Sequence, residues 1–385
     1  MYTVCRLKYQ AACHALRNLL YIFAIGRLRE LYGGAPSSPG MDISEFLQYG
    51  EDQTMKLEQS FMDFMLHHQE YHERSYNFLV LLEAVQTAAK YIQYFYQTGS
   101  LKYLMCEAGF TNVQGESVLE MDDIANAIVL HYLRRSNQVI CAVTEEETDP
   151  VPLNEDGGRY FFYFDPLDGS SNVKHNLSVG FMFAIAKRNL EGPEDGHLRK
   201  GSELRAAGIF LIPNGVFTLA LANTGVFRFH LDETMTYVIP ENSERLIMPE
   251  NPKGWELSFN ASNRKTFSGK VQSWIEEHEQ KYAFRYMGAL AGDFHRLLSN
   301  GGMFMYPAIV NHPEPEKNRP KGKLRLLYEA NVAAFIAREA EGTAIDEEGN
   351  EILEITPASP HQRTALYVGS RSLVESIRTR LRERG

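Results

Sequence analysis

The chain has 385 residues, of which 44% are hydrophobic and 23% charged, and Asp and Glu outnumber Lys and Arg by 49 to 39. This composition is typical of a globular protein with a sizeable core, and it excludes disordered, collagen-like and disulfide-framework classes. The formal net charge of −10 disfavours non-specific binding to nucleic acid or to anionic lipid, so we expect neither a nucleic-acid nor a membrane partner.

The cysteine content and the apolar runs bear on the compartment. The four cysteines form no Cys-x-x-Cys pair and no metal-ligand spacing. So few thiols in so long a chain predict a reducing compartment, and we expect a cytoplasmic location. No apolar run approaches the about 18–20 residues that a membrane span needs.

Residues 1–40 differ from the rest of the chain. The first 29 residues contain five basic residues and no acidic one, which is typical of a targeting segment or an amphipathic arm. The alternatives are a poorly ordered extension or a start codon placed upstream, and a linker-like stretch at 32–40 precedes Met41. We favour these alternatives and expect the working protein to span residues 41–385.

The pattern after Met41 changes once along the chain. Apolar residues recur near every 3.6 positions for about sixty residues, which predicts helix. From Asn112 onward, short β-rich runs alternate with helical ones, and the runs are Val139–Thr144, Tyr160–Phe164, Val179–Ala186, Ala206–Ile212, Val216–Ala222 and Val226–His230. This mixed succession predicts a layered α/β or α+β architecture.

Three prolines and many polar residues at 240–253 predict a domain boundary near residue 245. We therefore expect one domain at 41–245 and a second at 246–385. In the second we expect a helix around Asp293–Leu298, a proline-rich insert at His312–Pro320 and a long apolar helix at Leu326–Ala340.

Four groups of acidic residues stand out: Glu116 with Asp122, Glu145–Glu147, Asp165 with Asp168, and Glu329. Each has an ordinary explanation when taken alone. The pair of aspartates could cap a surface turn, the three glutamates could be a solvated charge run, and the last glutamate could pair with Lys323 or Arg325. An unpaired acid inside so apolar a helix would cost several kcal/mol, so Glu329 requires a base or a metal ion.

The segment around Asp165 predicts a strand, a turn and a helix N-terminus. Residues 159–164 form an apolar run, Pro166 cannot continue a strand ladder, and Gly169 permits a tight turn. Good helix N-cap residues come next at Ser170, Ser171 and Asn172. A helix N-terminus binds phosphate, and a divalent cation between the two aspartates would remove their repulsion.

The candidate ligands are all oxygen donors, which suits Mg²⁺ or Mn²⁺ better than zinc or copper. Metal ions held by carboxylates beside an anion-binding helix end are the parts that phosphate-ester hydrolysis needs. The chain has no Gly-x-x-x-x-Gly-Lys-Ser/Thr loop, so the sequence does not indicate ATP-driven chemistry of that class.

The segment Phe164-Asp-Pro-Leu-Asp-Gly-Ser-Ser-Asn172, with Glu145 and Glu146 upstream, resembles the lithium-sensitive phosphatase superfamily. Within it the chain is similar to the class I fructose-1,6-bisphosphatases, and more to the bacterial members. The match runs in order from about residue 112 to residue 370. Its further segments are 112–116, 178–180, 259–263, 285–286, 293–296, 301–307, 320–329, 361–363 and 369–370.

This resemblance implies a two-domain α/β sandwich of helix and sheet layers, assembled as a homotetramer. It implies hydrolysis of the 1-phosphate of fructose 1,6-bisphosphate by a metal-activated water, in gluconeogenesis or the Calvin cycle. Two or three Mg²⁺ or Mn²⁺ ions would bind to each subunit. The first domain would then hold the metal and the phosphate, and the second would bind the sugar.

The resemblance also implies a role for each matched residue. The metal ligands would be Glu145, Asp165, the carbonyl of Leu167, Asp168 and Glu329. Glu146 would activate the attacking water, with Glu116 and Asp122 supporting the metal cluster. The substrate would contact Asp168, Gly169, Ser170, Ser171, Asn260, Arg285, Tyr286, Tyr306 and Lys323, with Arg285 reaching a neighbouring subunit's site. From the residues alone, the two tyrosines would be interpreted as ordinary core aromatics, and only the resemblance favours a binding role.

Two other functions stay open from the sequence. One is a sedoheptulose-1,7-bisphosphatase, or an enzyme that acts on both sugars. The other is a catalytically silent sugar-phosphate sensor, which we expect to lack a metal-binding acid. All the matched acids are present here.

Overall fold

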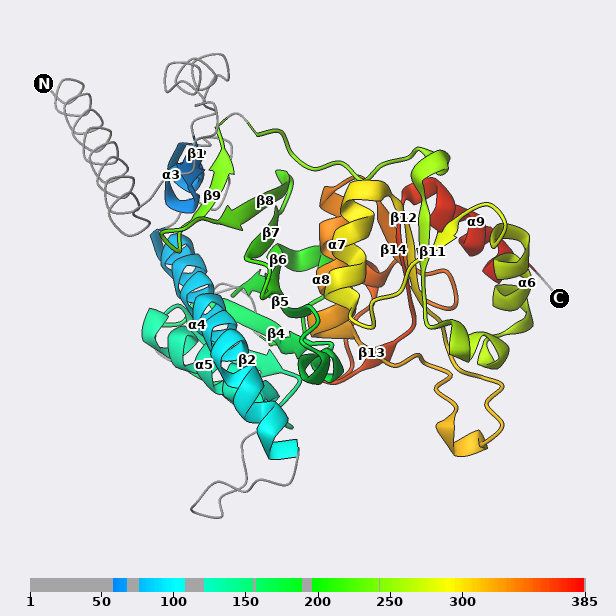
Figure 1. The fold of residues 1–385 in the computed structure, drawn as a ribbon, viewed down its shortest axis with the longest axis horizontal. Coiled ribbons are helices and arrows are strands. Elements are labelled where there is room, and N and C mark those ends of the chain that lie inside the picture. Colours follow the sequence, from blue (N-terminus) through cyan, green and yellow to red (C-terminus); the bar gives the residue numbers. More distant parts are fainter. Residues whose placement is uncertain are drawn as a thin grey trace, which may run out of the picture. The chain divides into compact units, whose positions relative to one another are not determined.

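The computed structural model describes residues 58–67, 76–107, 121–154, 157–188, 196–241 and 243–383. They belong to one compact unit, Leu57–Gly385. Figure 1 shows its helices and strands, coloured along the sequence from blue to red. The expectations for residues 1–40, and for the change of pattern near residue 112, lie outside the described residues. None of the helices in the described ranges is both long and apolar enough to cross a membrane.

Most strands of the first half join one sheet, with the spatial order β1-β9-β8-β7-β6-β5-β4-β2-β3. Its pairs are antiparallel except for β2 and β4, which run parallel. The strands are β1 (Glu58–Ser60), β2 (Val139–Thr144), β3 (Val151–Pro152), β4 (Tyr160–Asp168), β5 (Val179–Lys187), β6 (Leu204–Ile212), β7 (Val216–Leu221), β8 (Gly225–Leu231) and β9 (Tyr237–Pro240).

A second, mixed sheet has the order β11-β10-β12-β16-β14, and β13 pairs with β15 beside it. These strands are β10 (Glu256–Ser258), β11 (Ala283–Phe284), β12 (Gly302–Tyr306), β13 (Leu324–Arg325), β14 (Thr343–Ile345), β15 (Arg363–Thr364) and β16 (Leu366–Gly369).

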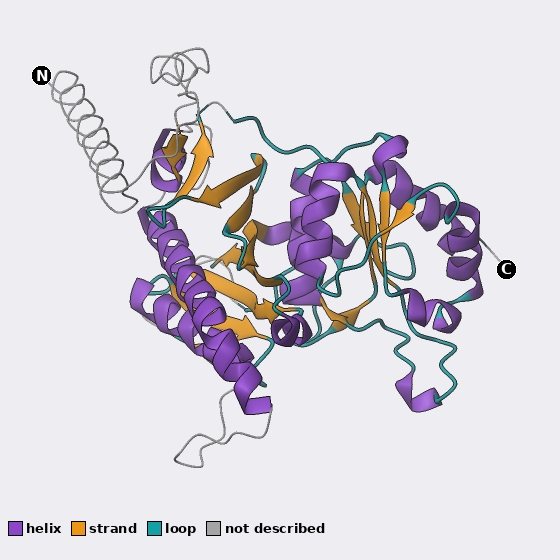
Figure 2. Ribbon diagram, in the orientation of Figure 1, coloured by secondary structure: helices purple, strands orange, loops and turns teal. Residues whose placement is uncertain are grey.

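The helices cover both sheets and fill the space between them (Figure 2). They are α3 (Phe61–His67), α4 (Tyr76–Glu107), α5 (Met121–Ser136), α6 (Gly269–His278), α7 (Leu290–Asn300), α8 (Asn331–Glu339) and α9 (Arg371–Arg382). Short 3-10 turns lie at Ser170–His175, Gly201–Glu203, Pro252–Gly254, Ala261–Thr266, Pro315–Lys317 and Ile352–Glu354, and a π-helical turn lies at Leu326–Ala330.

Three hydrophobic cores separate these layers. The first lies between α4, α5 and one face of the large sheet, and the second lies between its other face, α7, α8 and the small sheet. The third packs α6 and α9 against the far face of the small sheet. The central strands of the large sheet are therefore covered on both faces, which explains their uninterrupted apolar runs. The predicted layered α/β class is confirmed.

Several predicted elements differ from the structure. The expected sixty-residue helix begins, within the described residues, with the short strand β1, followed by α3 and α4. The long helix expected at Leu326–Ala340 opens with the π-helical turn before α8 continues it. The six β-rich runs correspond to β2, β4, β5, β6, β7 and β8, with bounds that shift by one or two residues except at the end of β4.

The expectation that the strand ends at Asp165 was wrong. Strand β4 continues through Pro166 to Asp168, because one extra residue bulges out of its pairing with β5 at this point. The predicted N-cap was wrong as well. Gly169 occupies that position with φ of 79°, and Ser170–His175 forms a 3-10 turn rather than an α-helix.

Candidate active site

A cavity of about 680 Å³ opens where β4, the π-helical turn and the small sheet meet. Its wall is polar for the most part and contains acidic, basic and aromatic side chains. The lining residues are Asp122, Asp123, Glu145, Glu146, Asp165, Leu167, Asp168, Gly169, Ser170, Ser171, Asn260, Tyr286, Gly288, Leu290, Phe304, Tyr306, Lys323, Leu324, Arg325, Glu329 and Arg363.

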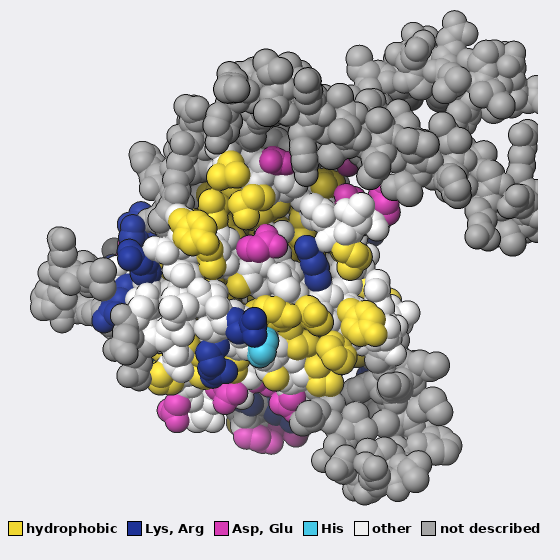
Figure 3. All heavy atoms as spheres, turned by 90° about the vertical axis from the view of Figure 1, so that its left-hand side faces the viewer, with side chains coloured by type: hydrophobic (Ala, Val, Ile, Leu, Met, Phe, Trp, Pro, Cys, Tyr) yellow, Lys and Arg dark blue, Asp and Glu magenta, His cyan; other side chains and the backbone are white. Residues whose placement is uncertain are grey.

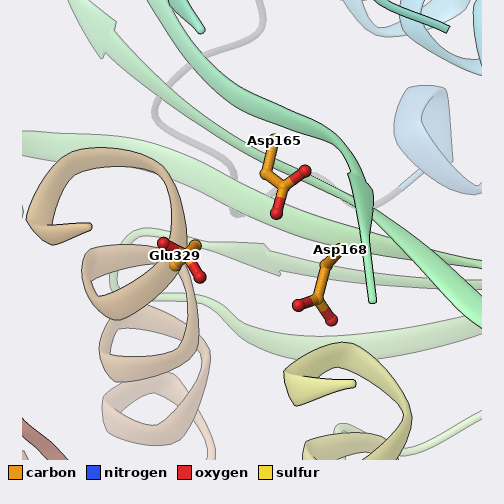
Figure 4. A group of neighbouring side chains, drawn as sticks. All are labelled: Asp165, Asp168 and Glu329. Atoms are coloured by element: carbon orange, nitrogen blue, oxygen red, sulfur yellow. The ribbon is translucent and has the colours of Figure 1, made fainter. Parts of the chain in front are cut away.

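The bulge in β4 brings Asp165 and Asp168 to the same side of the strand. Residues three apart on a regular strand point to opposite faces. Here Asp165 pairs with Met182 and Asp168 pairs with Gly180, so three steps along β4 match two steps along β5. The extra residue restores a common face for the two carboxylates, as Figure 4 shows.

Two further local features bring the glutamates to this place. Strands β2 and β4 are parallel, with Thr144 beside Phe164, so Glu145 follows β2 at the edge where Asp165 lies. The π-helical turn holds Glu329, whose Oε2 accepts a 2.6 Å hydrogen bond from the backbone N–H of Arg325.

Three of these carboxylates form a cluster. Asp165, Asp168 and Glu329 each offer an oxygen, and these oxygens all lie within 4.8 Å of one another. The side chains point toward a common centre, two from β4 and one from the turn before α8 (Figure 4). All three residues are buried, at 3%, 8% and 7% exposure, so little solvent screens their charges.

The cluster is electrostatically unfavourable in the absence of a cation. Burial raises the pKa of Asp165 well above its usual range, and the charges of Glu145, Asp168 and Glu329 raise it further. Burial raises the pKa of Asp168 to about 7, although N–H donors such as that of Ala291, 2.7 Å from Oδ2, lower it. The pKa of Glu329 rises to about 8, because of burial and then Glu145.

The donor set fits divalent metal ions. Among the described residues, no side-chain nitrogen of a lysine or arginine lies within 4 Å of an oxygen of the three clustered carboxylates, and Arg325 Nη2 instead approaches Glu145 Oε1 at 3.9 Å. Seven acidic and three basic side chains line the cavity. An anionic ligand would be repelled from such a wall unless cations bound there too, and hard oxygen donors are the ligands that Mg²⁺ and Mn²⁺ prefer.

The loop at 144–149, which we call the acidic loop, is fixed at its start by α5. Thr144 Oγ1 donates a 3.0 Å hydrogen bond to Asn126 Oδ1, and Asn126 Nδ2 donates one of 3.0 Å to Glu147 Oε1. The backbone N–H of Glu146 in turn donates to Thr144 Oγ1 at 3.4 Å. Glu146 is thereby placed in the cavity wall with an exposed side chain.

Another part of the wall is held by a buried acid that the sequence did not single out. Asp293 on α7 accepts hydrogen bonds of 2.9 and 3.0 Å from the backbone N–H of Met287, and burial raises its pKa to about 6. Asn172 Nδ2 donates to the carbonyl of Met287 at 3.1 Å from the other side. These bonds fix the segment that carries Tyr286 and Gly288 into the cavity.

Most of the predicted site residues lie together in the structure. The cavity wall contains Asp122, Glu145, Glu146, Asp165, Leu167, Asp168, Gly169, Ser170, Ser171, Asn260, Tyr286, Tyr306, Lys323 and Glu329. Arg285 is exposed and does not line the cavity; its Nη1 donates to the carbonyl of Phe284. Glu116 lies outside the described residues.

Some lining residues were missed from the sequence. Arg325 and Arg363 face each other across the β13–β15 ladder and both reach the cavity. Arg325 was considered as an ion-pair partner of Glu329, but its backbone N–H makes that contact, and no ion pair joins Glu329 to Arg325 or Lys323 in the described part of the chain. Charge balance is the sequence signal that could have identified these two arginines, because an anion-binding site with so many acidic residues needs arginines nearby.

Comparison with known proteins gives the family. The model of the fructose-1-6-bisphosphatase N-terminal domain matches residues 60–240, and that of the C-terminal domain matches residues 248–382. The chain belongs to the fructose-1,6-bisphosphatase family. A class 1 fructose-1,6-bisphosphatase of Syntrophus aciditrophicus is 61% identical over 327 residues, which cover 84% of this chain and 98% of the relative.

Other members are more distant but cover most of the fold. A class 1 fructose-1,6-bisphosphatase of Cytophaga hutchinsonii is 35% identical over 77% of this chain and 86% of its own length. The holo-form crystal structure of Leishmania major fructose-1,6-bisphosphatase superposes with a TM-score of 0.73 at 28% identity, covering 85% of this chain and 100% of that chain. The T-state structure of the same enzyme gives a TM-score of 0.71 over the same coverage.

Proposed function

We infer that this protein hydrolyses the 1-phosphate of fructose 1,6-bisphosphate, releasing fructose 6-phosphate and inorganic phosphate. The observation that carries this inference, in a chain of this family, is the cavity that holds three clustered buried carboxylates together with basic and aromatic side chains. A sugar bisphosphate has an anionic group at each end and hydroxyls between them. The lining of the cavity offers complementary chemistry to both parts.

We propose that Glu145, Asp165, the carbonyl of Leu167, Asp168 and Glu329 hold two or three Mg²⁺ ions, or Mn²⁺ in their place. When bound, these ions would activate a water and neutralise charge on the phosphoryl and leaving oxygens. The crowding of buried acids, none of the three clustered ones in an ion pair within the described ranges, supports this assignment.

The chain's own groups would complete the reaction. The turn Asp168–Ser171 lines the cavity beside the carboxylate cluster and would orient the 1-phosphate. The exposed carboxylate of Glu146 would accept the proton of the attacking water, with Asp122, and Glu116 by its match to the family, supporting the cluster. General base assistance of this kind contributes about 10²–10⁴-fold to a rate.

The sugar end would bind to the basic and aromatic side chains of the lining. Lys323 would pair with the 6-phosphate as a charged donor, and Asn260, Tyr286 and Tyr306 would donate to the phosphate and to sugar hydroxyls. Burial raises the pKa of Tyr286 to about 12, so its hydroxyl keeps its proton and stays a hydrogen-bond donor.

Phosphate release from fructose 1,6-bisphosphate, with Mg²⁺ and with EDTA, tests this function. We expect turnover with Mg²⁺ and none with EDTA, and we expect Asp165→Asn to abolish it. Sedoheptulose 1,7-bisphosphate is the second substrate to measure. Hydrolysis of the heptulose ester alone would move the assignment to that substrate, and hydrolysis of neither would leave the sensor function.

We also propose that the protein is a homotetramer, with Arg285 reaching the site of a neighbouring subunit. Four large aromatic side chains of α4, Tyr76, Tyr91, Tyr94 and Phe95, are 79%, 48%, 57% and 39% exposed. Figure 3 shows hydrophobic side chains gathered on this face of the molecule. Exposed apolar patches mark surfaces that bind a partner. Sedimentation equilibrium should give four times the mass of one chain.

The domain division and the location remain predictions. We propose a boundary near residue 245, between a metal and phosphate domain and a sugar-binding domain, and the separate family models for residues 60–240 and 248–382 support it. A cytoplasmic location rests on the low cysteine content. Roles in gluconeogenesis or the Calvin cycle follow from the same reaction.

A further inference from the structure

The ring of His361 lies between the two parts of the chain that carry the glutamates of the site. Its Nε2 is 2.9 Å from the carbonyl oxygen of Thr148, in the acidic loop. Its Nδ1 is 2.9 Å from the hydroxyl of Tyr328, the residue before Glu329. The side chain is half-buried and does not line the cavity.

The two contacts define the tautomer of the neutral ring. A backbone carbonyl only accepts hydrogen bonds, so Nε2 carries the proton and donates to Thr148. In the neutral ring Nδ1 is then an acceptor, and the hydroxyl of Tyr328 donates to it. One imidazole thus joins the acidic loop to the π-helical turn through two hydrogen bonds of opposite direction.

The backbone on each side of this link is fixed. Strand β15, two residues after His361, pairs with β13, and the N–H of Leu326 donates to the carbonyl of Gln362 at 2.7 Å. Tyr328 is fully buried, so its hydroxyl has a fixed position. The acidic loop is the part that the link restrains, since Thr148 is exposed and lies beyond the bonds that Asn126 makes at the start of the loop.

We propose that His361 is a positioning residue, which holds the acidic loop against the turn that carries Glu329. Glu145 and Glu329 come from different halves of the chain, and His361 adds two hydrogen bonds to the long 3.9 Å ion pair between Arg325 and Glu145. The N–H of Glu145 also donates to the carbonyl of Phe164 at 3.3 Å, and Asn126 holds Thr144 and Glu147, so loss of the link would remove the restraint on the far end of the acidic loop and loosen the placement of Glu145 and Glu146. This inference rests on the proposed function, because it assigns the glutamates to the metal and to the attacking water.

The test compares His361→Phe with the parent protein by two measurements. Binding of Mn²⁺ alone, without substrate, is followed by electron paramagnetic resonance, and kcat and KM are measured for fructose 1,6-bisphosphate. Loss of a group bonded directly to a metal ligand typically costs about 10–100-fold in affinity or activity, and His361 bonds to residues beside the ligands, so we expect the lower end of this range. We expect Mn²⁺ affinity and kcat to fall by about tenfold or more, with KM changed by less than about twofold.

Two further variants separate the two hydrogen bonds. His361→Gln places an amide N–H near the position of Nε2, which can still donate to Thr148, and His361→Asn places a carbonyl oxygen near Nδ1, which can still accept from Tyr328. Because the loop is the restrained part, we expect Gln to recover more of the Mn²⁺ affinity than Asn. These variants also carry the test if His361→Phe does not fold.

His278→Phe is the matched control. His278 is another half-buried histidine, stacked on Trp274 at 4.1 Å between ring centroids and bonded to its carbonyl, but it does not line the cavity. We expect this variant to keep the Mn²⁺ affinity and kcat of the parent.

The outcomes are distinct. If His361→Phe keeps both Mn²⁺ affinity and kcat within about twofold of the parent, even with a lower melting temperature, the role is merely structural and the proposal is overturned. A parent protein that hydrolyses no sugar bisphosphate would instead refute the proposed function, and the Mn²⁺ measurement would still report on the link.

Discussion

Replacing Glu329 by Gln should stabilise the protein in the absence of metal. The pKa of this carboxyl is raised from 4.5 to about 8 in the folded protein. Because the folded-state pKa is above the unfolded value, the folded state is penalised as pH rises from 4.5, and the penalty is complete above pH 8. The variant keeps an acceptor for the N–H of Arg325 but has no charge to bury.

The size of this effect follows from the shift. At 1.36 kcal/mol per pKa unit, the penalty is about 2 kcal/mol at pH 6 and approaches about 5 kcal/mol above pH 8. In EDTA, Glu329→Gln should therefore exceed the parent in free energy of unfolding by about these amounts. With Mn²⁺ the order should reverse, because a ligand that binds only the folded state stabilises the parent.

The assay is urea unfolding at several pH values, with both proteins at the same concentration. Glu339→Gln is the control, since Glu339 lies on the adjoining helix α8 with a side chain 8% exposed but pairs with Arg338 at 2.8 Å. This variant should lose a little stability and show no gain that grows with pH. An advantage of Glu329→Gln that is absent at pH 8.5, or that does not increase with pH, would refute the reasoning.

The same geometry supports three further predictions. Gly169→Ala should lose about 1–3 kcal/mol of stability and most activity, because φ is 79° and the added Cβ would lie 2.4 Å from that of Ala289. Gly269→Ala is the control, because the space around this glycine is open. It should leave thermal melting and turnover unchanged. Asp293→Ala frees the N–H of Met287 and should raise KM for the substrate by about tenfold, with a smaller fall in kcat; an unchanged KM would contradict this. Binding of Mn²⁺, followed by calorimetry in buffers of different ionisation enthalpy, should release protons at pH 6–7, because the clustered carboxyls have raised pKa values; no proton release would refute it.

The sequence was a good guide to the strands and a poorer one to irregular backbone. Continuous apolar runs identified β2 and β4–β8, because strands covered on both faces need apolar residues throughout. Pro166 was read as the end of a strand, because proline cannot donate to a ladder. In the structure a β-bulge lies between Asp165 and Asp168, and strand β4 continues past Pro166 to Asp168.

The acidic residues of the site could be identified from the chemistry of their side chains, but their arrangement in space could not be predicted from the sequence. Asp165 and Glu329 are 164 positions apart in the sequence, and nothing local reports that a bulge and a π-helical turn aim both at one point. Asp293 and His361 were overlooked as contributors to the site for a related reason. They act through backbone groups of other residues, Met287 six positions before Asp293 and Thr148 far from His361, and those hydrogen bonds exist only once the chain is folded.

The central claim is that the buried acids share divalent ions in the cavity. Anomalous diffraction from crystals grown with Mn²⁺ tests it most directly. We predict manganese peaks within about 2.5 Å of oxygens of Asp165, Asp168 and Glu329. Crystals of active protein in which manganese binds elsewhere, and these three carboxylates hold none, would contradict it.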